Sequence, residues 1–315
     1  MIMKTKQIKI GQFVIKNPIF LSPMVDVTDL PYRLICRKAG VEYASTEMLY
    51  VDAITHENSA TTKHMQTIPS EKIKIIQITG NNLKEFEKAI PQLKKYDIVD
   101  INCGCPSIRI TGNEAGSFLL KNPKKIADII KLLKKEGLTV TAKIRLGFNN
   151  NNVLETAKAI EEAGASLLTV HARLATHSNK IPADWNWIAK VKKELKIPVI
   201  GNGDIDSGKK AEEMLKIADG CMIARAAIGD PDIFYRINQY LKTGKEIPFS
   251  FERNIKYLKL YLKYCKKYKF NNLHRIKYVS TSFFRNMQGA AKLREKSMSC
   301  KSIEEIEEVV NSIKI

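Results

Sequence analysis

The sequence has no long apolar stretch and no paired set of cysteines. No apolar run approaches the roughly 20 residues that a membrane-spanning helix needs, and residues 1–11 alternate Lys with Ile and lack the apolar core of a secretory signal. The cysteines do not have the spacing of a zinc site or a disulfide framework. They are Cys36, Cys103, Cys105, Cys221, Cys265 and Cys300. We therefore expect a cytoplasmic globular protein with reduced thiols, no bound metal and no membrane contact.

Acidic residues are scarce relative to basic ones. The chain of 315 residues has 33 Asp and Glu against 52 Lys and Arg, which gives a net charge of +19. The excess is concentrated, because residues 251–296 contain 13 Lys and Arg against 2 Glu, or +11, while all other residues share +8. Such a concentration favours binding to a polyanion such as nucleic acid. A coding bias toward Lys is the alternative source of the charge.

Apolar, β-branched runs bounded by polar turn residues recur along residues 1–225 and predict eight strands. Several runs are apolar throughout, as expected of parallel strands that are covered on both faces. The predicted strands are Pro18–Leu21, Tyr43–Thr46, Ile73–Ile78, Ile98–Asn102, Val140–Ile144, Leu167–His171, Pro198–Asn202 and Gly220–Ala224.

Helical periodicity fills most of the gaps between these strands. The predicted helices are Leu30–Ala39, Leu83–Leu93, Pro123–Lys135, Leu154–Ala163, Trp185–Leu195, Gly208–Ile217 and Pro231–Leu241. Eight strand–helix repeats over residues 1–243 indicate a (β/α)8 TIM barrel. A doubly-wound open sheet is the alternative, but no Gly-x-Gly-x-x-Gly turn follows the first strand.

In a TIM barrel the active site is built at the carboxyl ends of the strands. Here those ends carry mostly polar residues, namely Pro23-Met24, Glu47, Gln77, Asn102, Lys143, His171, Asn202 and Arg225. Each of these has an ordinary structural interpretation when taken alone. Their convergence on one rim favours a functional site.

Two loops suggest particular chemistry. Gly201-Asn202-Gly203-Asp204 after the seventh strand, with Ala224-Arg225 after the eighth, has the pattern of a phosphate site in a barrel, although Gly-Asn-Gly is also simply a good turn. After the fourth strand, Cys105 lies between Gly104 and Pro106, and a thiol on such a stiff loop suits an acid or a nucleophile.

Taken in order, the motifs resemble those of the tRNA-dihydrouridine synthases, flavin enzymes that reduce uridines of transfer RNA. The resemblance covers nearly the whole barrel. Its segments are Ser22–Asp29 with Tyr32-Arg33, Gln77–Gly80, Asp100–Pro106 with Ala115-Gly116 and Leu119-Leu120, Lys143–Gly147, His171–Arg173, Ala183–Trp185, Gly201–Ile205 and Ala224-Arg225.

The resemblance implies FMN at the barrel mouth, NADPH as its reductant, and Cys105 as the proton donor to the uracil ring. The cofactor-binding residues that it implies are Pro23, Met24, Gln77, Lys143, His171, Asn202, Gly203, Asp204, Ala224 and Arg225. It also implies that Asn102, Arg145 and Arg173 hold the uracil. Reduced flavin would give a hydride to one carbon of the uracil double bond while Cys105 protonates the other.

The chain departs from the family pattern in three places. Val25-Asp26 replaces small residues and is expected to place a carboxylate near the flavin. Ala224 replaces a commoner glycine, but it can donate its N–H to a phosphate if its φ is negative. The loop Thr176–Pro182 lacks an aromatic residue that is frequent in the family.

A change of composition after Thr243-Gly244 predicts a domain boundary, so that residues 244–315 form a small all-α helical domain. Within Glu252–Tyr268 the helical period separates an apolar face, a tyrosine face and a basic face that contains Lys259 and Lys263. The basic face is expected to contact transfer RNA, with Arg275, Lys277, Arg285, Lys292 and Arg294 extending it. The ordinary alternative is a solvated basic face over buried tyrosines.

Two other functions remain open at this stage. A flavin barrel that acts on a free pyrimidine, similar to dihydroorotate dehydrogenase, also has a phosphate loop and an Asn-x-x-Cys-Pro turn. A barrel that binds RNA without catalysis would hold no flavin. The concentrated basic charge disfavours the first alternative, and a yellow protein would exclude the second. No feature of the sequence indicates a protein partner.

Charge reversal at Lys259 and Lys263 is expected to weaken RNA binding and to flatten its dependence on salt. With fewer phosphate contacts, binding of the RNA releases fewer counterions. The measurement is the affinity for transfer RNA over a series of salt concentrations. Unchanged binding would assign these lysines to a solvated helix face.

Overall fold

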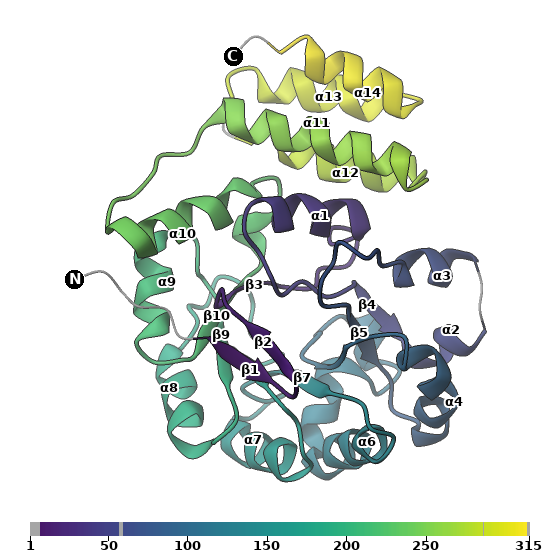
Figure 1. The fold of residues 1–315 in the computed structure, drawn as a ribbon, viewed down its shortest axis with the longest axis vertical. Coiled ribbons are helices and arrows are strands. Elements are labelled where there is room, and N and C mark those ends of the chain that lie inside the picture. Colours follow the sequence, from purple (N-terminus) through teal and green to yellow (C-terminus); the bar gives the residue numbers. More distant parts are fainter. Residues whose placement is uncertain (1–6, 57–58, 286, 314–315) are drawn as a thin grey trace.

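The computed structural model describes residues 7–56, 59–285 and 287–313. Its centre is a sheet of eight parallel strands (Figure 1). In chain order the strands are β3 (Ile19–Leu21), β4 (Met48–Tyr50), β5 (Ile75–Thr79), β6 (Ile98–Cys103), β7 (Val140–Arg145), β8 (Leu168–His171), β9 (Val199–Asn202) and β10 (Gly220–Ile223). From β4 to β10 each strand pairs with the next one in the chain, and β10 also pairs with β3. The predicted TIM barrel is therefore confirmed.

The ring closes through the segment that precedes β4. An isolated parallel bridge joins Leu21 to Ala44, and the N–H of Leu21 donates to the carbonyl of Tyr43 at 3.0 Å. The sequence predicts the second strand at Tyr43–Thr46, whereas the regular strand lies at Met48–Tyr50. The predicted residues pair with β3 at one position only, so the prediction found the point of closure and missed the strand itself.

Helices surround the strands (Figure 1). The helices of the barrel are α1 (Leu30–Lys38), α2 (Val51–Thr55), α3 (Ser59–Met65), α4 (Leu83–Leu93), α5 (Ile108–Thr111), α6 (Pro123–Lys135), α7 (Val153–Glu162), α8 (Trp185–Glu194), α9 (Gly208–Leu215) and α10 (Asp232–Thr243), with 3₁₀ turns η1 (Gly116–Lys121) and η2 (Arg225–Ala227). All seven predicted barrel helices are present, with small differences at their ends. The short helices α2, α3 and α5 were not predicted.

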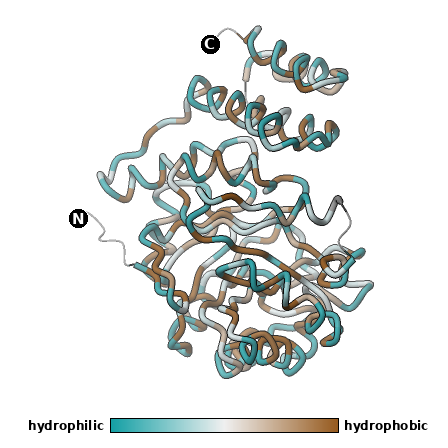
Figure 2. Tube along the Cα trace, turned by 45° about the vertical axis from the view of Figure 1, so that its right-hand side comes forward, coloured by the Kyte–Doolittle hydropathy of each residue, from teal (hydrophilic) through white to brown (hydrophobic). Residues whose placement is uncertain are grey.

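Apolar side chains fill both the inside of the barrel and the layer between strands and helices. Hydropathy alternates along the helices, and hydrophobic residues follow the strands (Figure 2). A separate apolar cluster at the amino-terminal end joins Phe20, Tyr43 and Met222 to Ile8 and Ile15 of a small antiparallel hairpin. The hairpin consists of β1 (Ile8–Ile10) and β2 (Phe13–Ile15), and it covers that end of the barrel. The opposite, carboxyl end, here called the mouth, is left for a site.

Four further helices follow a linker after Gly244, which ends α10 in the left-handed region at φ 70°. They are α11 (Phe251–Lys267), α12 (Leu273–Ser282), α13 (Ala290–Ser299) and α14 (Ile303–Asn311), called here the C-terminal helices. They pack together above α1 and α10 (Figure 1). The predicted apolar face of α11 is buried, and α14 begins at the predicted cap, where Ser302 Oγ accepts from the N–H of Glu305 at 3.2 Å. Among the described residues, no helix is long and apolar enough to cross a membrane.

Tyr32 of α1 connects the barrel to these helices. Its ring packs edge-on against Tyr261 and Phe283, with centroids 6.0 Å and 6.4 Å apart. Its hydroxyl donates to the carbonyl of Ala227 and accepts from the N–H of Gly229 at 3.0 Å. The loop after the eighth strand of the barrel is thereby held to α1.

A buried arginine of α12 makes a second connection. Arg275 is 7% exposed and forms ion pairs with Glu47 and Asp26, which lie at the ends of the second and first barrel strands. Burial raises the pKa of Glu47 to about 7, and the charge of Arg275 opposes that shift. The expectation that Arg275 extends an exposed basic face is therefore wrong, because its charge is used inside the protein.

Replacing Tyr32 by Phe is expected to lower the free energy of unfolding by roughly 1–3 kcal/mol, because the carbonyl of Ala227 and the N–H of Gly229 lose a buried partner. Urea denaturation measures the change. Tyr278→Phe is the matched control, since that side chain is 47% exposed. Equal stability of the two variants would contradict the assigned role of the Tyr32 hydroxyl.

Candidate functional site

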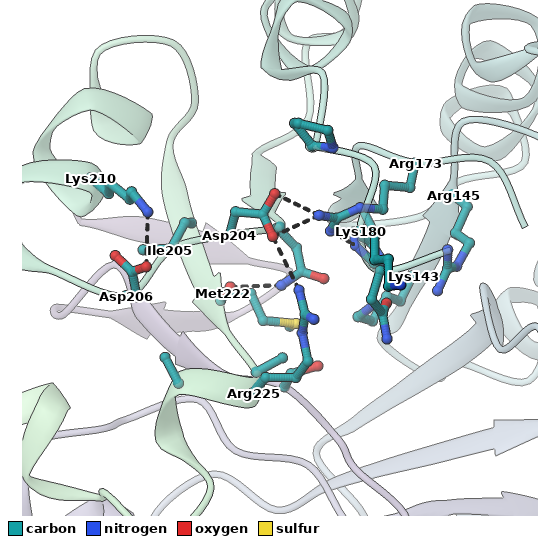
Figure 3. Close-up of a pocket in the computed structure, with 18 of the residues that line it drawn as sticks. Lys143, Arg145, Arg173, Lys180, Asp204, Ile205, Asp206, Lys210, Met222 and Arg225 are labelled. Atoms are coloured by element: carbon teal, nitrogen blue, oxygen red, sulfur yellow. Dashed lines mark hydrogen bonds and ion pairs between the residues drawn. The ribbon is translucent and has the colours of Figure 1, made fainter. Parts of the chain in front are cut away.

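A cavity of about 850 Å³ opens at the carboxyl ends of β7 to β10 (Figure 3). Its volume is in the range of pockets that hold cofactors. Nine of the residues predicted for the site line it, namely Lys143, Arg145, His171, Arg173, Asn202, Gly203, Asp204, Ala224 and Arg225. The strand ends thus bring together residues that are far apart in the sequence.

The cavity is strongly positive. Seven of its lining residues are Lys or Arg, and only two, Asp204 and Asp206, are acidic. The effect is visible at His171, where burial first and then the neighbouring Lys143, Arg145, Arg173 and Arg225 lower the pKa to about 2. The imidazole is therefore neutral. Because a guanidinium can only donate, the Nε2 atom of His171, 3.1 Å from Arg173 Nη1, accepts a hydrogen bond, and the ring proton is assigned to Nδ1.

Asp204 holds two of these cations together. Its carboxylate accepts from Arg173 Nη2 at 2.6 Å and 2.7 Å, from Arg225 Nη2 at 3.1 Å, and from the N–H of Ala183 at 2.9 Å (Figure 3). Burial alone would raise the pKa of Asp204, but the hydrogen bonds from Arg173 and Ala183 outweigh it, so that the pKa lies below its usual value. The carboxylate is thus occupied by protein groups.

The backbone at the same loops offers unused donors. Among the hydrogen bonds of the described residues, none is donated by the backbone N–H of Gly203, Asp204 or Ala224. These three groups are called here the cradle. Gly203 has φ 125°, and a Cβ there would lie 2.7 Å from the Cβ of Ala183, so only glycine fits. Unpaired N–H groups beside a cation form an anion-binding concavity.

Lys143 faces the cavity from β7. Burial, with the neighbouring Arg145 guanidinium, lowers its pKa to about 8, while the charge of Asp100 opposes the shift. In the described residues its ammonium makes no hydrogen bond and no ion pair within 4.0 Å. A partly desolvated cation of this kind stabilises negative charge on a bound group more strongly than a cation in water does.

The loop that carries Cys105 is fixed at several points. The side-chain oxygen of Asn102 accepts from the N–H groups of Gly104 and Cys105 at 3.1 Å and 2.9 Å. Arg145 Nε donates to the carbonyl of Gly104 at 2.8 Å, and the N–H of Ser117 donates to the carbonyl of Cys105 at 2.9 Å. Cys105 is half-buried, whereas Cys103 is fully buried. The thiol therefore has a defined position at the mouth.

A buried chain of hydrogen bonds leads to this loop. Thr141 Oγ1 donates to Asp100, Gln77 Nε2 donates to the other oxygen of Asp100 at 2.6 Å, and Asn102 Nδ2 donates to Gln77 Oε1 at 2.8 Å. Most of the polar capacity of Gln77 and Asn102 is thereby satisfied within the protein. Each retains one amide hydrogen for a ligand. Asp100 belongs to the motifs found in the sequence, but this chain of hydrogen bonds was not predicted, because its members lie on different strands that only the barrel brings together.

Seven predicted residues do not line the cavity. They are Pro23, Met24, Gln77, Asn102, Cys105, Lys259 and Lys263. Cys105 adjoins the cavity through Gly104, whose carbonyl binds Arg145. Lys259 and Lys263 are exposed on α11, and neither has an acidic partner among the described residues, whereas Lys256 and Lys266 pair with Glu252 and Glu307. The roles predicted for these seven residues stay predictions.

Several residues that line the cavity were not predicted from the sequence as part of the site. They include Ser22, Lys180, Lys210, Met222 and Arg285. Ser22 and Met222 lie next to predicted strand ends, a signal that was available in the sequence. Lys180 lies in a loop whose contacts had no sequence signal, and Arg285 reaches the cavity from the turn after α12.

The family model and the relatives found by sequence comparison have descriptions that agree. A family model described as dihydrouridine synthase (Dus) matches residues 20–314. tRNA-dihydrouridine synthase B of Pseudomonas syringae is 36% identical over 248 residues, which cover 76% of this chain and 74% of that protein. A probable tRNA-dihydrouridine synthase of Helicobacter pylori is 36% identical over 230 residues, 70% of each chain.

Solved structures share the fold at low identity. The chain resembles 2-naphthoyl-CoA reductase with a TM-score of 0.60 and 15% identity, covering 74% of this chain and 52% of that one. An old yellow enzyme homologue from Zymomonas mobilis gives a TM-score of 0.54 and 12% identity over 79% of this chain and 95% of that one. At such identities the likeness concerns the barrel fold alone.

The ammonium of Lys143 is expected to lose its proton near pH 8, because burial and Arg145 disfavour its charged form. Exposed lysines titrate near ~10.4. Carbon-13 NMR of labelled lysine side chains measures this, with Lys143→Met identifying the resonance. Arg145→Gln should move the titration to higher pH. A Lys143 resonance that titrates together with the exposed lysines would contradict the described environment.

Proposed function

This chain belongs to the dihydrouridine synthase family, as its motifs indicated, and on that premise we propose that it reduces uridines of transfer RNA to 5,6-dihydrouridine with FMN as cofactor and NADPH as reductant. The observation that carries the proposal is the positive cavity at the barrel mouth, next to a rigidly held thiol. The volume and charge of the cavity suit a phosphorylated cofactor, and a thiol that adjoins the cavity supports the role of proton donor.

The residues present fit FMN. The cradle and Arg225 offer N–H donors and a cation to a phosphate, and φ of Ala224 is −116°, which leaves its N–H able to donate. Asp204 would contribute through its N–H, since its carboxylate already binds Arg173 and Arg225. Asn202 and His171 line the same cavity, and Gln77 retains one amide hydrogen for the flavin ring. Pro23 and Met24, at the end of the first strand, complete the proposed set.

When bound and reduced by NADPH, the flavin supplies a hydride to the uracil ring. Lys143 would place its positive charge beside the cofactor, where it stabilises the negative charge of the reduced form. Burial and Arg145 lower the pKa of Lys143 to about 8, and a negative charge beside the ammonium would raise that pKa again, so the charge would be present at neutral pH.

Cys105 would hold the second proton of the reaction on its Sγ and give it to the uracil ring. Its loop is fixed by Asn102, Arg145 and Ser117, so the position of the sulfur is already set before the proton is transferred.

For the uracil itself, Arg145 fits better than Arg173. Arg145 Nη2 has no partner among the described residues, whereas Nε, Nη1 and Nη2 of Arg173 bind Ile181, His171 and Asp204. Asn102 retains one amide hydrogen for the same purpose.

The C-terminal helices are proposed to form a separate tRNA-binding domain, residues 244–315, with residues 1–243 as the catalytic domain. The charge of +11 within residues 251–296 and the exposed Lys259 and Lys263 support this division. A stacked uridine cannot reach a barrel mouth, so it must leave the stack at a cost of a few kcal/mol. Phosphate contacts by a basic surface offset that cost. A transfer RNA substrate also supports a cytoplasmic location.

The test is to purify the protein, record its visible spectrum, and incubate it with NADPH and transfer RNA from a strain that lacks it. The expected result is a yellow protein that forms dihydrouridine at positions that strain has lost. A yellow protein that reduces free pyrimidines and ignores RNA would support the dihydroorotate dehydrogenase-like alternative. A colourless protein that binds RNA would support a barrel without catalysis.

Cys105→Ala is expected to keep flavin and tRNA bound but to slow uridine reduction by roughly 10²–10⁴-fold, the usual contribution of a general acid. Single-turnover reduction with pre-reduced enzyme measures the step. Cys300→Ala, which removes a thiol between α13 and α14, is the control. Undiminished reduction by Cys105→Ala would show that another group donates the proton.

A further inference from the structure

Two cations at the edge of the cavity have no acidic partner. Among the basic residues that line it, Arg173 and Arg225 bind Asp204, and Lys210 binds Asp206 at 2.8 Å. Arg145 binds two carbonyls, and Lys143 is half-buried on β7. Lys180 and Arg285 remain. Both side chains are exposed, and neither makes a hydrogen bond or ion pair among the described residues.

Arg285 is brought to the cavity by a turn that is packed firmly against the barrel. Phe283 and Phe284, just before it, are buried. Asn254 Nδ2 donates to the carbonyls of Gly229 and Phe283, and a Cβ on Gly229 would lie 2.3 Å from the carbonyl oxygen of Ser282. The turn therefore lies directly on the loop that follows η2 and the cradle. A residue of the C-terminal helices is fixed at the mouth of the barrel.

Lys180 is held from the other direction. It belongs to the loop after β8, and the carbonyl of the next residue, Ile181, accepts from Arg173 Nε at 2.6 Å. Ala183, two residues further on, donates its N–H to Asp204. Lys180 lies beside Arg173 in Figure 3. Since β8 and β10 flank β9 in the sheet, Lys180 and Arg285 come from the two sides of the β9 end.

We propose that Lys180 and Arg285 form a clamp that binds backbone phosphates of the RNA strand next to the uridine that enters the cavity. The inference rests on the proposed function and adds two substrate-binding residues to it. The phosphate of a cofactor already has the cradle and Arg225. Exposed cations at the edge instead suit a ligand that extends out of the cavity.

The clamp has a physical purpose. Extrusion of a uridine bends the strand on both sides of it, and cations fixed at those points stabilise the extruded form selectively. Because one cation belongs to the barrel and the other to the C-terminal helices, both parts of the chain would contact the same short stretch of RNA.

The experiment compares Lys180→Gln, Arg285→Gln and the double variant with the wild type and with Lys193→Gln. Lys193 is an exposed lysine on α8 outside the cavity, so its variant loses the same charge at a site away from the cavity edge. Binding of an unmodified tRNA transcript to the flavin-loaded proteins is measured by fluorescence anisotropy over a series of KCl concentrations, without NADPH. Flavin content and steady-state reduction of the same transcript are measured in parallel.

Each single clamp variant is expected to lower the slope of log affinity against log salt by roughly 0.7–0.9, and the double variant by twice that amount. KM for tRNA should rise, whereas flavin content should stay unchanged. Lys193→Gln should behave as the wild type.

Salt slopes equal to that of the wild type would overturn the clamp, and so would a loss of flavin without a change in tRNA binding, which would assign the two residues to the cofactor phosphate. Because the slopes are measured without turnover, they test the clamp separately from the reaction. Absence of dihydrouridine with the wild-type protein would reject the proposed function instead.

Discussion

The mouth of this barrel depends on holding several cations close together. Like charges in a partly desolvated pocket repel one another strongly. Burial first, and then the charges of Lys143, Arg145, Arg173 and Arg225, lower the pKa of His171 to about 2. Asp204 makes the arrangement possible, because its single carboxylate binds both Arg173 and Arg225. Its backbone and that of Gly203 lie at positive φ, which directs the carboxylate to the two arginines. The positive field that this arrangement maintains suits an anionic cofactor and an anionic substrate alike.

The same carboxylate changes the interpretation of individual residues. All three nitrogens of Arg173 already bind protein groups, so this residue shapes the loop after β8 and orients His171. Arg145 differs, since it holds the Cys105 loop through Gly104 and its Nη2 atom has no partner among the described residues. The position of the thiol and the binding of the substrate are therefore linked through one guanidinium.

The connection between the barrel and the C-terminal helices is built at the mouth as well. The carboxylate of Asp26 binds Arg275 of α12 at 2.9 Å. The expectation that this carboxylate lies near the flavin stays a prediction. Asp26 has φ 64°, and its N–H donates to Glu47, which pairs with the same arginine. Tyr32 supplies the second connection, from α1 to the loop after η2. The loops after the first and eighth strands and the residue just before β4 thus contact the C-terminal helices. The same packing brings Arg285 to the cavity.

The sequence by itself determined the class of fold, the order of strands and helices, the family, and most of the cavity lining. These follow from local signals, since apolar periodicity and the residues at strand ends are properties of short segments. Only the tertiary structure decided which charges are free. Whether Arg275 is exposed, whether Arg173 has a donor to spare, and whether Arg285 faces the cavity all depend on partners distant in the chain. Periodicity reports the face on which a side chain lies, whereas packing alone decides what stands opposite it.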